Sequence, residues 1–108
     1  MEPEFEAFID CWNAGRFFEA HEVLEGLWIR TRDEVQRGLI QLAAALYHVQ
    51  RGNLRGARTM LERSLSRLGG NALRSPVPVA DMVAYAQRML RDLTDANGAA
   101  ILNSRPRM

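Results

Sequence analysis

Apolar residues recur at helical spacing along almost the whole chain, and this periodicity is the feature that most restricts its fold. A spacing of about 100° per residue is that of an amphipathic helix. Five segments follow it, over residues 4–13, 17–30, 34–51, 54–68 and 79–94. No segment shows the alternating pattern of a half-buried strand. The sequence therefore predicts an all-α fold with five helices.

The segment over residues 34–51 differs from the other four because it is apolar almost all round between residues 39 and 49. A helix without a polar face is typical of the centre of a bundle. We therefore expect this helix to be the most buried element, with Ala43, Leu46 and Tyr47 largely removed from solvent.

A pattern of glycine, apolar residues and alanine repeats along the chain after a shift of 37 residues. The two copies are Gly15, Phe17, Ala20, Leu24 and Trp28, then Gly52, Leu54, Ala57, Leu61 and Leu65. The pattern resembles the tetratricopeptide repeat, in which a small alanine lets the second helix of a pair pack closely on the first. It predicts two tetratricopeptide-like hairpins followed by a C-terminal capping helix. A generic helical bundle whose loops coincide is the alternative.

The length of 108 residues allows one domain. We expect a single helical domain over residues 1–95 and a loose C-terminal tail over residues 96–108. The N-terminus lacks the basic segment of a signal peptide, and the longest apolar stretch is too short to cross a bilayer. These features predict a cytoplasmic protein that makes no membrane contact.

Missing residue types exclude several kinds of chemistry. All 14 basic residues are arginine, so no lysine is present to form a Schiff base or to complete a phosphate-binding loop. The single cysteine, Cys11, excludes internal disulfides and zinc sites with two or more thiolates. The common hydrolase and dinucleotide-binding motifs do not occur. No reaction can be assigned from the sequence, and whether the protein is an enzyme stays open.

Four polar residues interrupt faces that are otherwise apolar. His21 and Glu25 lie four positions apart on one predicted helix, and Gln41 and His48 lie seven apart on the next. If these helices form an antiparallel hairpin, residues whose numbers add to about 66 lie level at the usual rise of about 1.5 Å per residue. Gly38 then lies level with Trp28. The sequence predicts one connected cluster with Phe18 and Trp28 beside it, made of His21, Glu25, Gln41 and His48.

Three interpretations of this cluster are open. The residues could form a buried structural network in which they satisfy one another's hydrogen bonds. They could instead bind a small ligand or a divalent metal, because two imidazoles and a carboxylate are a common ligand set for zinc, manganese or iron. They could also form a metal-free acid/base pair in which Glu25 orients His21 for proton transfer.

The sequence His21-x-x-x-Glu25-x-x-Trp28, with the second block 38–48, resembles a family of small bacterial and archaeal helical proteins. This family is the domain of unknown function 309, whose hallmark is a His-x-x-x-Glu-x-x-Trp/Tyr motif. The resemblance extends over about residues 8–68 and more weakly over residues 79–93. It implies an all-helical fold and a metal-binding role for His21 and Glu25. It implies no established activity, substrate or partner.

An interaction module is the alternative function. Residues 1–34 carry nine acidic and three basic residues, whereas residues 35–108 carry four and eleven. Arg51, Arg55 and Arg58 share a stripe that could pair with an acidic protein or with RNA. Nucleic acid is the less favoured partner, because no aromatic residues are interleaved to stack on bases. Trp12 and Tyr85 are equally compatible with a homo-oligomer interface and with core packing.

Overall fold

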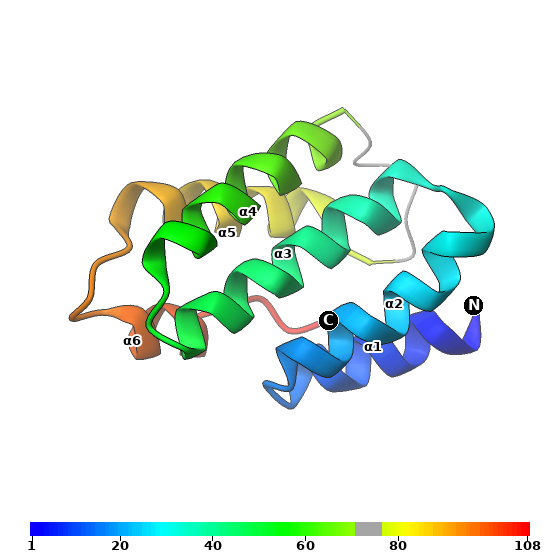
Figure 1. Cartoon of the computed structure of the whole chain (residues 1–108), viewed down its shortest axis with the longest axis horizontal. Helices are drawn as coiled ribbons and strands as arrows, with labels where there is room; N and C mark the ends of the chain where they lie inside the picture. The colour runs from blue at the N-terminus through cyan, green and yellow to red at the C-terminus, as the bar shows by residue number, and fades with distance from the viewer. Residues whose placement is uncertain (71–76) are drawn as a thin grey trace.

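The computed structural model describes residues 1–70 and 77–108 of the chain. Its elements are α1 (Pro3–Asn13), α2 (Phe17–Thr31), α3 (Glu34–Gln50), α4 (Leu54–Leu68), α5 (Val79–Asp92) and α6 (Gly98–Asn103) (Figure 1). No strand occurs in these two ranges, so the predicted all-α class is confirmed. The number of helices is corrected from five to six, because α6 was not predicted.

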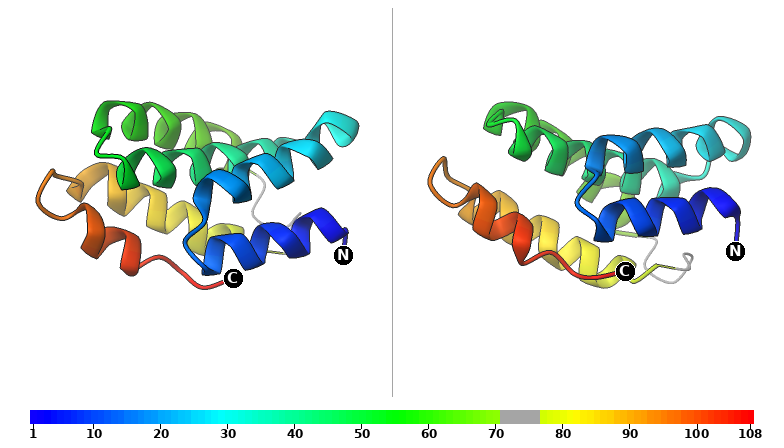
Figure 2. Two further views of the ribbon diagram at one scale, coloured as in Figure 1. Left: turned by 60° about the horizontal axis from the view of Figure 1, so that its bottom comes forward. Right: turned by 90° about the horizontal axis from the view of Figure 1, so that it is seen from below.

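The helices lie in two layers, one made of α2, α3 and α4 and the other of α1, α5 and α6 (Figure 2). Each helix from α1 to α4 contacts the helix that follows it along the chain, and α6 contacts α3. This order is that of successive helical hairpins. The tetratricopeptide-like geometry of the pairs stays a prediction.

α3 is the most buried element, as its sequence predicts. Eleven of its 17 residues are buried, whereas no other helix has more than five. Ala43 and Leu46 are fully buried, but Tyr47 is only partly buried. The Tyr47 ring lies 5.1 Å from that of Phe18, between centres, and Tyr47 is removed from solvent less completely than Ala43 and Leu46.

α3 and α4 approach each other most closely at Gly38. A Cβ atom added to Gly38 would lie 2.7 Å from Cδ2 of Leu68, closer than real Cβ atoms come to their neighbours. The hydroxyl of Ser64 donates a 2.8 Å hydrogen bond to the Gly38 carbonyl oxygen in this contact. The sequence predicts that Gly38 lies level with Trp28 of α2. In the structure, Leu68 of α4 occupies the space left by the missing side chain of Gly38.

Side-chain caps begin the two helices that follow α2. The carboxylate of Asp33 accepts a 3.0 Å hydrogen bond from the backbone N–H of Gln36 at the start of α3. The side-chain oxygen of Asn53 accepts one of the same length from Gly56 at the start of α4. Asp and Asn are favoured at these positions because they satisfy N–H groups that have no partner within the helix.

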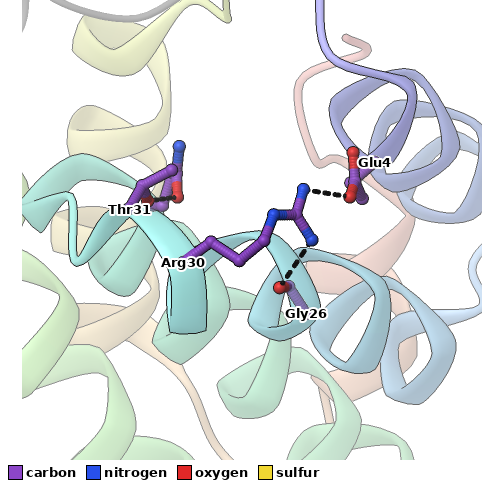
Figure 3. Close-up of polar contacts among 5 residues, drawn as sticks. Glu4, Gly26, Arg30 and Thr31 are labelled. Carbon is purple, nitrogen blue, oxygen red and sulfur yellow. Dashed lines mark hydrogen bonds and ion pairs between the residues drawn. The ribbon is translucent and has the colours of Figure 1, made fainter.

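An ion pair joins α1 to α2 near the N-terminus (Figure 3). The guanidinium of Arg30 donates a 2.6 Å hydrogen bond to the carboxylate of Glu4, and a second one of 3.3 Å to the carbonyl of Gly26. The hydrogen bond from Arg30 lowers the pKa of Glu4 from its usual value of 4.5.

The C-terminal residues fold back onto α1, where the sequence analysis expected a loose tail. The indole N–H of Trp12 donates a 2.8 Å hydrogen bond to the carbonyl of Pro106. Arg105 donates hydrogen bonds to the carbonyls of Trp12 and Asn13, the last residues of α1. Trp12 is fully buried and Tyr85 is only 3% exposed, so both aromatic residues belong to the core of a single chain.

None of the helices in the described ranges has both the length and the apolar character needed to span a bilayer.

Candidate functional site

A small cavity of about 120 Å³ opens between α2, α3 and α4. We call it the Gln41 cavity. It brings together three of the four residues of the predicted cluster and adds two arginines and an apolar wall. The lining residues are His21, Glu25, Arg37, Ile40, Gln41, Ala44, Met60 and Arg63.

Helical spacing explains how these side chains reach one cavity. His21 and Glu25 lie one turn apart on α2, and Met60 and Arg63 lie one turn apart on α4. On α3, the spacing from Arg37 to Gln41 is four residues, and a further three residues lead to Ala44. Each helix therefore contributes a single stripe of its surface to the cavity.

Gln41 is the most unusual residue of the cavity. It is 6% exposed, and its buried side-chain oxygen has no hydrogen-bond partner in the described part of the chain. Gln36, five residues earlier on the same helix, is 9% exposed, and its side-chain oxygen accepts a hydrogen bond from the Thr31 hydroxyl. Buried polar groups are nearly always satisfied, so the free oxygen of Gln41 calls for an explanation.

His21 and Glu25 face each other without forming a hydrogen bond. His21 Nε2 and Glu25 Oε2 are 3.8 Å apart, and Arg37 Nη1 is also 3.8 Å from the same carboxylate oxygen. These distances exceed hydrogen-bond range. The polar side chains of the cavity are close together but form no hydrogen bonds with one another. The structural-network interpretation requires such hydrogen bonds.

The two arginines of the cavity are held differently. The Arg37 guanidinium stacks on the Trp28 ring, 4.6 Å from its centre, and Arg32 lies over the same ring at 4.5 Å. Trp28 therefore positions Arg37, although it does not line the cavity itself. Arg63 makes no hydrogen bond or ion pair with any residue that the structure describes. Its charge is available to a ligand.

Phe18 flanks the cavity at the surface. Phe18 is 44% exposed, and its ring lies 5.7 Å from the imidazole of His21, between centres. Phe18 thus lies next to His21, and Trp28 lies next to Arg37.

His48 does not join the other three residues, which corrects the predicted four-residue cluster. Its Nδ1 lies 3.2 Å from Nδ2 of Asn53, and the ring fills the space beside Gly56 at the corner between α3 and α4. Seven residues along a helix amount to about 10 Å, so sharing a stripe with Gln41 does not bring the two side chains together. His48 therefore shapes the corner, whereas Gln41 lines the cavity.

The cavity does not fit a divalent metal. Within residues 1–70 and 77–108, no three His, Cys, Asp or Glu side chains are grouped closely enough to hold one. His21 and Glu25 are the only such residues in the lining, and two guanidinium groups share the cavity with them. Positive charges at this position would repel a cation. The interpretation of the cluster as a zinc, manganese or iron site therefore finds no support in the described residues.

The basic stripe is partly engaged by contacts within the chain. Arg51 donates a 3.2 Å hydrogen bond to the hydroxyl of Tyr47, and Arg58 donates one of 3.0 Å to the carbonyl of Leu93. Arg55 is exposed. No observation in the described residues favours this stripe as a binding surface.

Sequence reasoning missed Arg37 and Arg63 as members of the site. Arg37 carried a usable signal, because it lies four residues before Gln41 and so shares its stripe on α3. The sequence contains no signal for Arg63, because the position of its side chain depends on how α4 is rotated against α3.

Comparison with known proteins supports the expected family. Residues 5–60 match the family model of a domain of unknown function, DUF309, and include every lining residue except Arg63. A protein of Aquifex aeolicus (strain VF5), described as uncharacterized, is 36% identical over 59 residues, which are 51% of this chain and 18% of that protein. The uncharacterized protein YpuF of Bacillus subtilis (strain 168) is 42% identical over 53 residues, 45% of this chain and 30% of its own. The matched segment thus spans less than a third of either relative. No solved structure matches the chain.

Proposed function

This chain belongs to the DUF309 family, and we propose that it binds a small polar molecule in the Gln41 cavity. The observation that carries the proposal is that Gln41 lines this cavity while its buried side-chain oxygen has no hydrogen-bond partner among the described residues. An unsatisfied buried acceptor costs about 1–3 kcal/mol. A ligand that donates a hydrogen bond to this oxygen would remove that cost on binding.

The other polar side chains of the cavity also support ligand binding. The carboxylate of Glu25 and the imidazole of His21 are 3.8 Å apart, and Arg63 has no partner among the described residues. None of these groups would have to break a strong contact in order to bind a ligand. Binding sites of this kind combine an apolar wall with a few convergent polar groups. Here Ile40, Ala44 and Met60 supply the wall.

His21 adds an imidazole to the lining of the site. The imidazole lies beside the carboxylate of Glu25, so a ligand that draws the two closer would create an acid/base pair. Binding itself requires only that His21 and Glu25 line the cavity, and it is the function that this geometry supports best.

The test is a titration of isotope-labelled protein by nuclear magnetic resonance. The probes are single small compounds, namely amino acids, hydroxy acids, amines and inorganic phosphate. We expect at least one to shift the side-chain amide signals of Gln41 and the backbone signals around Glu25. Gln41→Met should abolish the shifts of the backbone signals around Glu25, whereas Gln36→Met, a matched change on the same helix, should keep them. If no probe shifts these signals, the proposal is wrong.

A further inference from the structure

We infer that two copies of this chain associate through the exposed face of α2, with the two helices antiparallel and in contact at Gly26. This face of α2 is separate from the one that lines the Gln41 cavity. The inference follows from a glycine that no contact inside the chain requires, from an exposed isoleucine beside it and from the order of charges along the helix.

Gly26 lies in the interior of α2, on its exposed face. Glycine weakens a helix interior relative to alanine. A Cβ added to Gly26 would meet nothing within 4 Å, so no contact with a described residue requires the side chain to be absent. Gly38 shows how such a position is used, because α4 packs into the space that its side chain would fill. Gly26 offers the same space to a helix from another molecule.

Ile29 supplies an apolar contact next to Gly26. It lies one turn further along α2 and is 58% exposed, the highest value for a large apolar side chain in any helix of the described ranges. Val23, one turn before Gly26, is partly buried. In an antiparallel pair that meets at Gly26, Ile29 of one copy faces Val23 and Gly26 of the other. Helices pack closely where a side chain of one enters a gap of the other.

The charges of α2 make this face complementary to itself. Glu22 lies four residues before Gly26 and Arg30 lies four residues after it, so the three lie along one face. In the antiparallel pair, residues whose numbers add to 52 lie level. Glu22 of each copy is therefore level with Arg30 of the other, at both ends of the contact. A two-fold dimer requires such self-complementarity, and this is why a second copy fits the face.

Both charged side chains are accessible for this contact. Glu22 is exposed, and the side chain of Arg30 is 59% exposed. The Arg30 guanidinium donates hydrogen bonds to Glu4 and to the carbonyl of Gly26 (Figure 3). These use two of its five N–H groups. Arg30 is thus held beside Gly26 and keeps N–H groups for a carboxylate of the second copy.

The test is sedimentation velocity of the full chain at concentrations up to about 1 mM, where a dimer with a Kd of that size would hold half of the protomers. We expect a monomer–dimer equilibrium that weakens at high salt, because exposed ion pairs are screened. Gly26→Gln should raise the Kd about tenfold or more, because a side chain there would hold the helices apart. The matched control is Gly70→Gln, at another glycine with open space around it, and it should change nothing.

An exchange of charges tests the antiparallel arrangement. Glu22→Arg places two arginines level at each end of the contact, and Arg30→Glu places two carboxylates there. Each variant alone should therefore dimerise about tenfold more weakly or worse. In an equimolar mixture of the two, the mixed dimer has opposite charges at both ends, so it should form about as well as the wild-type dimer. Circular dichroism reports whether each variant is folded, since Arg30→Glu also removes the hydrogen bond to Glu4.

Each contrary result would overturn the inference. A wild-type chain that stays monomeric at about 1 mM does not self-associate through α2. If the chain dimerises and Gly26→Gln has no effect, the interface lies on another surface. If the mixture of charge variants fails to recover dimerisation, the helices do not pair in the antiparallel arrangement. The proposed function is tested separately, because His21 and Glu25 line the Gln41 cavity from a different face of α2.

Discussion

The hydroxyl of Ser64 in α4 donates a buried 2.8 Å hydrogen bond to the carbonyl oxygen of Gly38 in α3. Two helix backbones come this close only where the residue between them has no side chain. A Cβ on Gly38 would lie 2.7 Å from Leu68, and Leu68 is itself fully buried. This contact fixes how α4 is placed on α3, and with it the position of Arg63 in the Gln41 cavity.

Gly38→Ala should therefore destabilise the protein. The added methyl group would force Leu68 or the backbone of α4 to move, and overpacking of this kind costs about 1–3 kcal/mol. The matched control is Gly26→Ala in α2, where an added Cβ meets nothing within 4 Å. That change should stabilise by about 0.5–1 kcal/mol, because alanine favours a helix interior over glycine. Urea unfolding of both variants measures the difference, and equal effects would contradict the packing argument.

The role of Gly38 shows what the sequence could and could not predict about this fold. The periodicity of apolar residues located the first five helices, because burial of one face is a local property that spacing reveals. The partner of a small residue is not local. A glycine on an apolar helix indicates close approach, but it does not say whether α2 or α4 is the helix that approaches.

Gln41→Met should leave stability unchanged or raise it by up to about 1 kcal/mol. The substitution keeps the length of the side chain and removes a buried oxygen that has no partner. Gln36→Met, on the same helix, should lower stability by about 1 kcal/mol, because it removes the acceptor of the Thr31 hydroxyl. Chemical denaturation measures both. A loss of more than about 1 kcal/mol for the Gln41 variant would favour the structural-network interpretation.

The candidate site was predictable where it depends on spacing within one hairpin. His21, Glu25 and Gln41 meet because residues whose numbers add to about 66 lie level across α2 and α3. His48 was wrongly grouped with Gln41 because the prediction did not account for the distance along the helix axis between residues seven positions apart. Its neighbours Asn53 and Gly56 come from the next helix, whose position the hairpin does not determine.

Glu4→Gln should make stability less dependent on acidic pH. The hydrogen bond from Arg30 lowers the pKa of Glu4 in the folded chain, so the folded state binds this proton less readily than the unfolded state. Its contribution is complete above the usual value of 4.5 and is lost as the pH falls through the lowered pKa. The melting temperatures of wild type and variant should therefore differ at pH 7 and converge in acid.

The control for this pH effect is Glu62→Gln, an exposed carboxylate for which no ion pair occurs in the described residues. Its melting temperature should run parallel to that of wild type at every pH. High salt should shrink the Glu4 effect, because exposed ion pairs are screened. A difference between wild type and Glu4→Gln that persists unchanged in acid would show that the pair with Arg30 does not stabilise the fold.

Arg105→Ala should release the C-terminal residues from α1. Arg105 donates hydrogen bonds of 3.0 and 2.9 Å to the carbonyls of Trp12 and Asn13 at the end of α1, where carbonyl groups lack N–H donors from their own helix. The Trp12 carbonyl also accepts a 3.1 Å hydrogen bond from the backbone N–H of Gly15. Hydrogen bonds from a charged donor contribute about 1.5–3 kcal/mol, so a loss of about 2 kcal/mol is expected. The indole N–H of Trp12 should also exchange with solvent faster, because its acceptor is the carbonyl of the neighbouring Pro106. Arg107→Ala, two residues further on at an exposed position, should change stability by less than about 0.5 kcal/mol. If both variants behave like wild type, the C-terminal segment does not hold α1 in place.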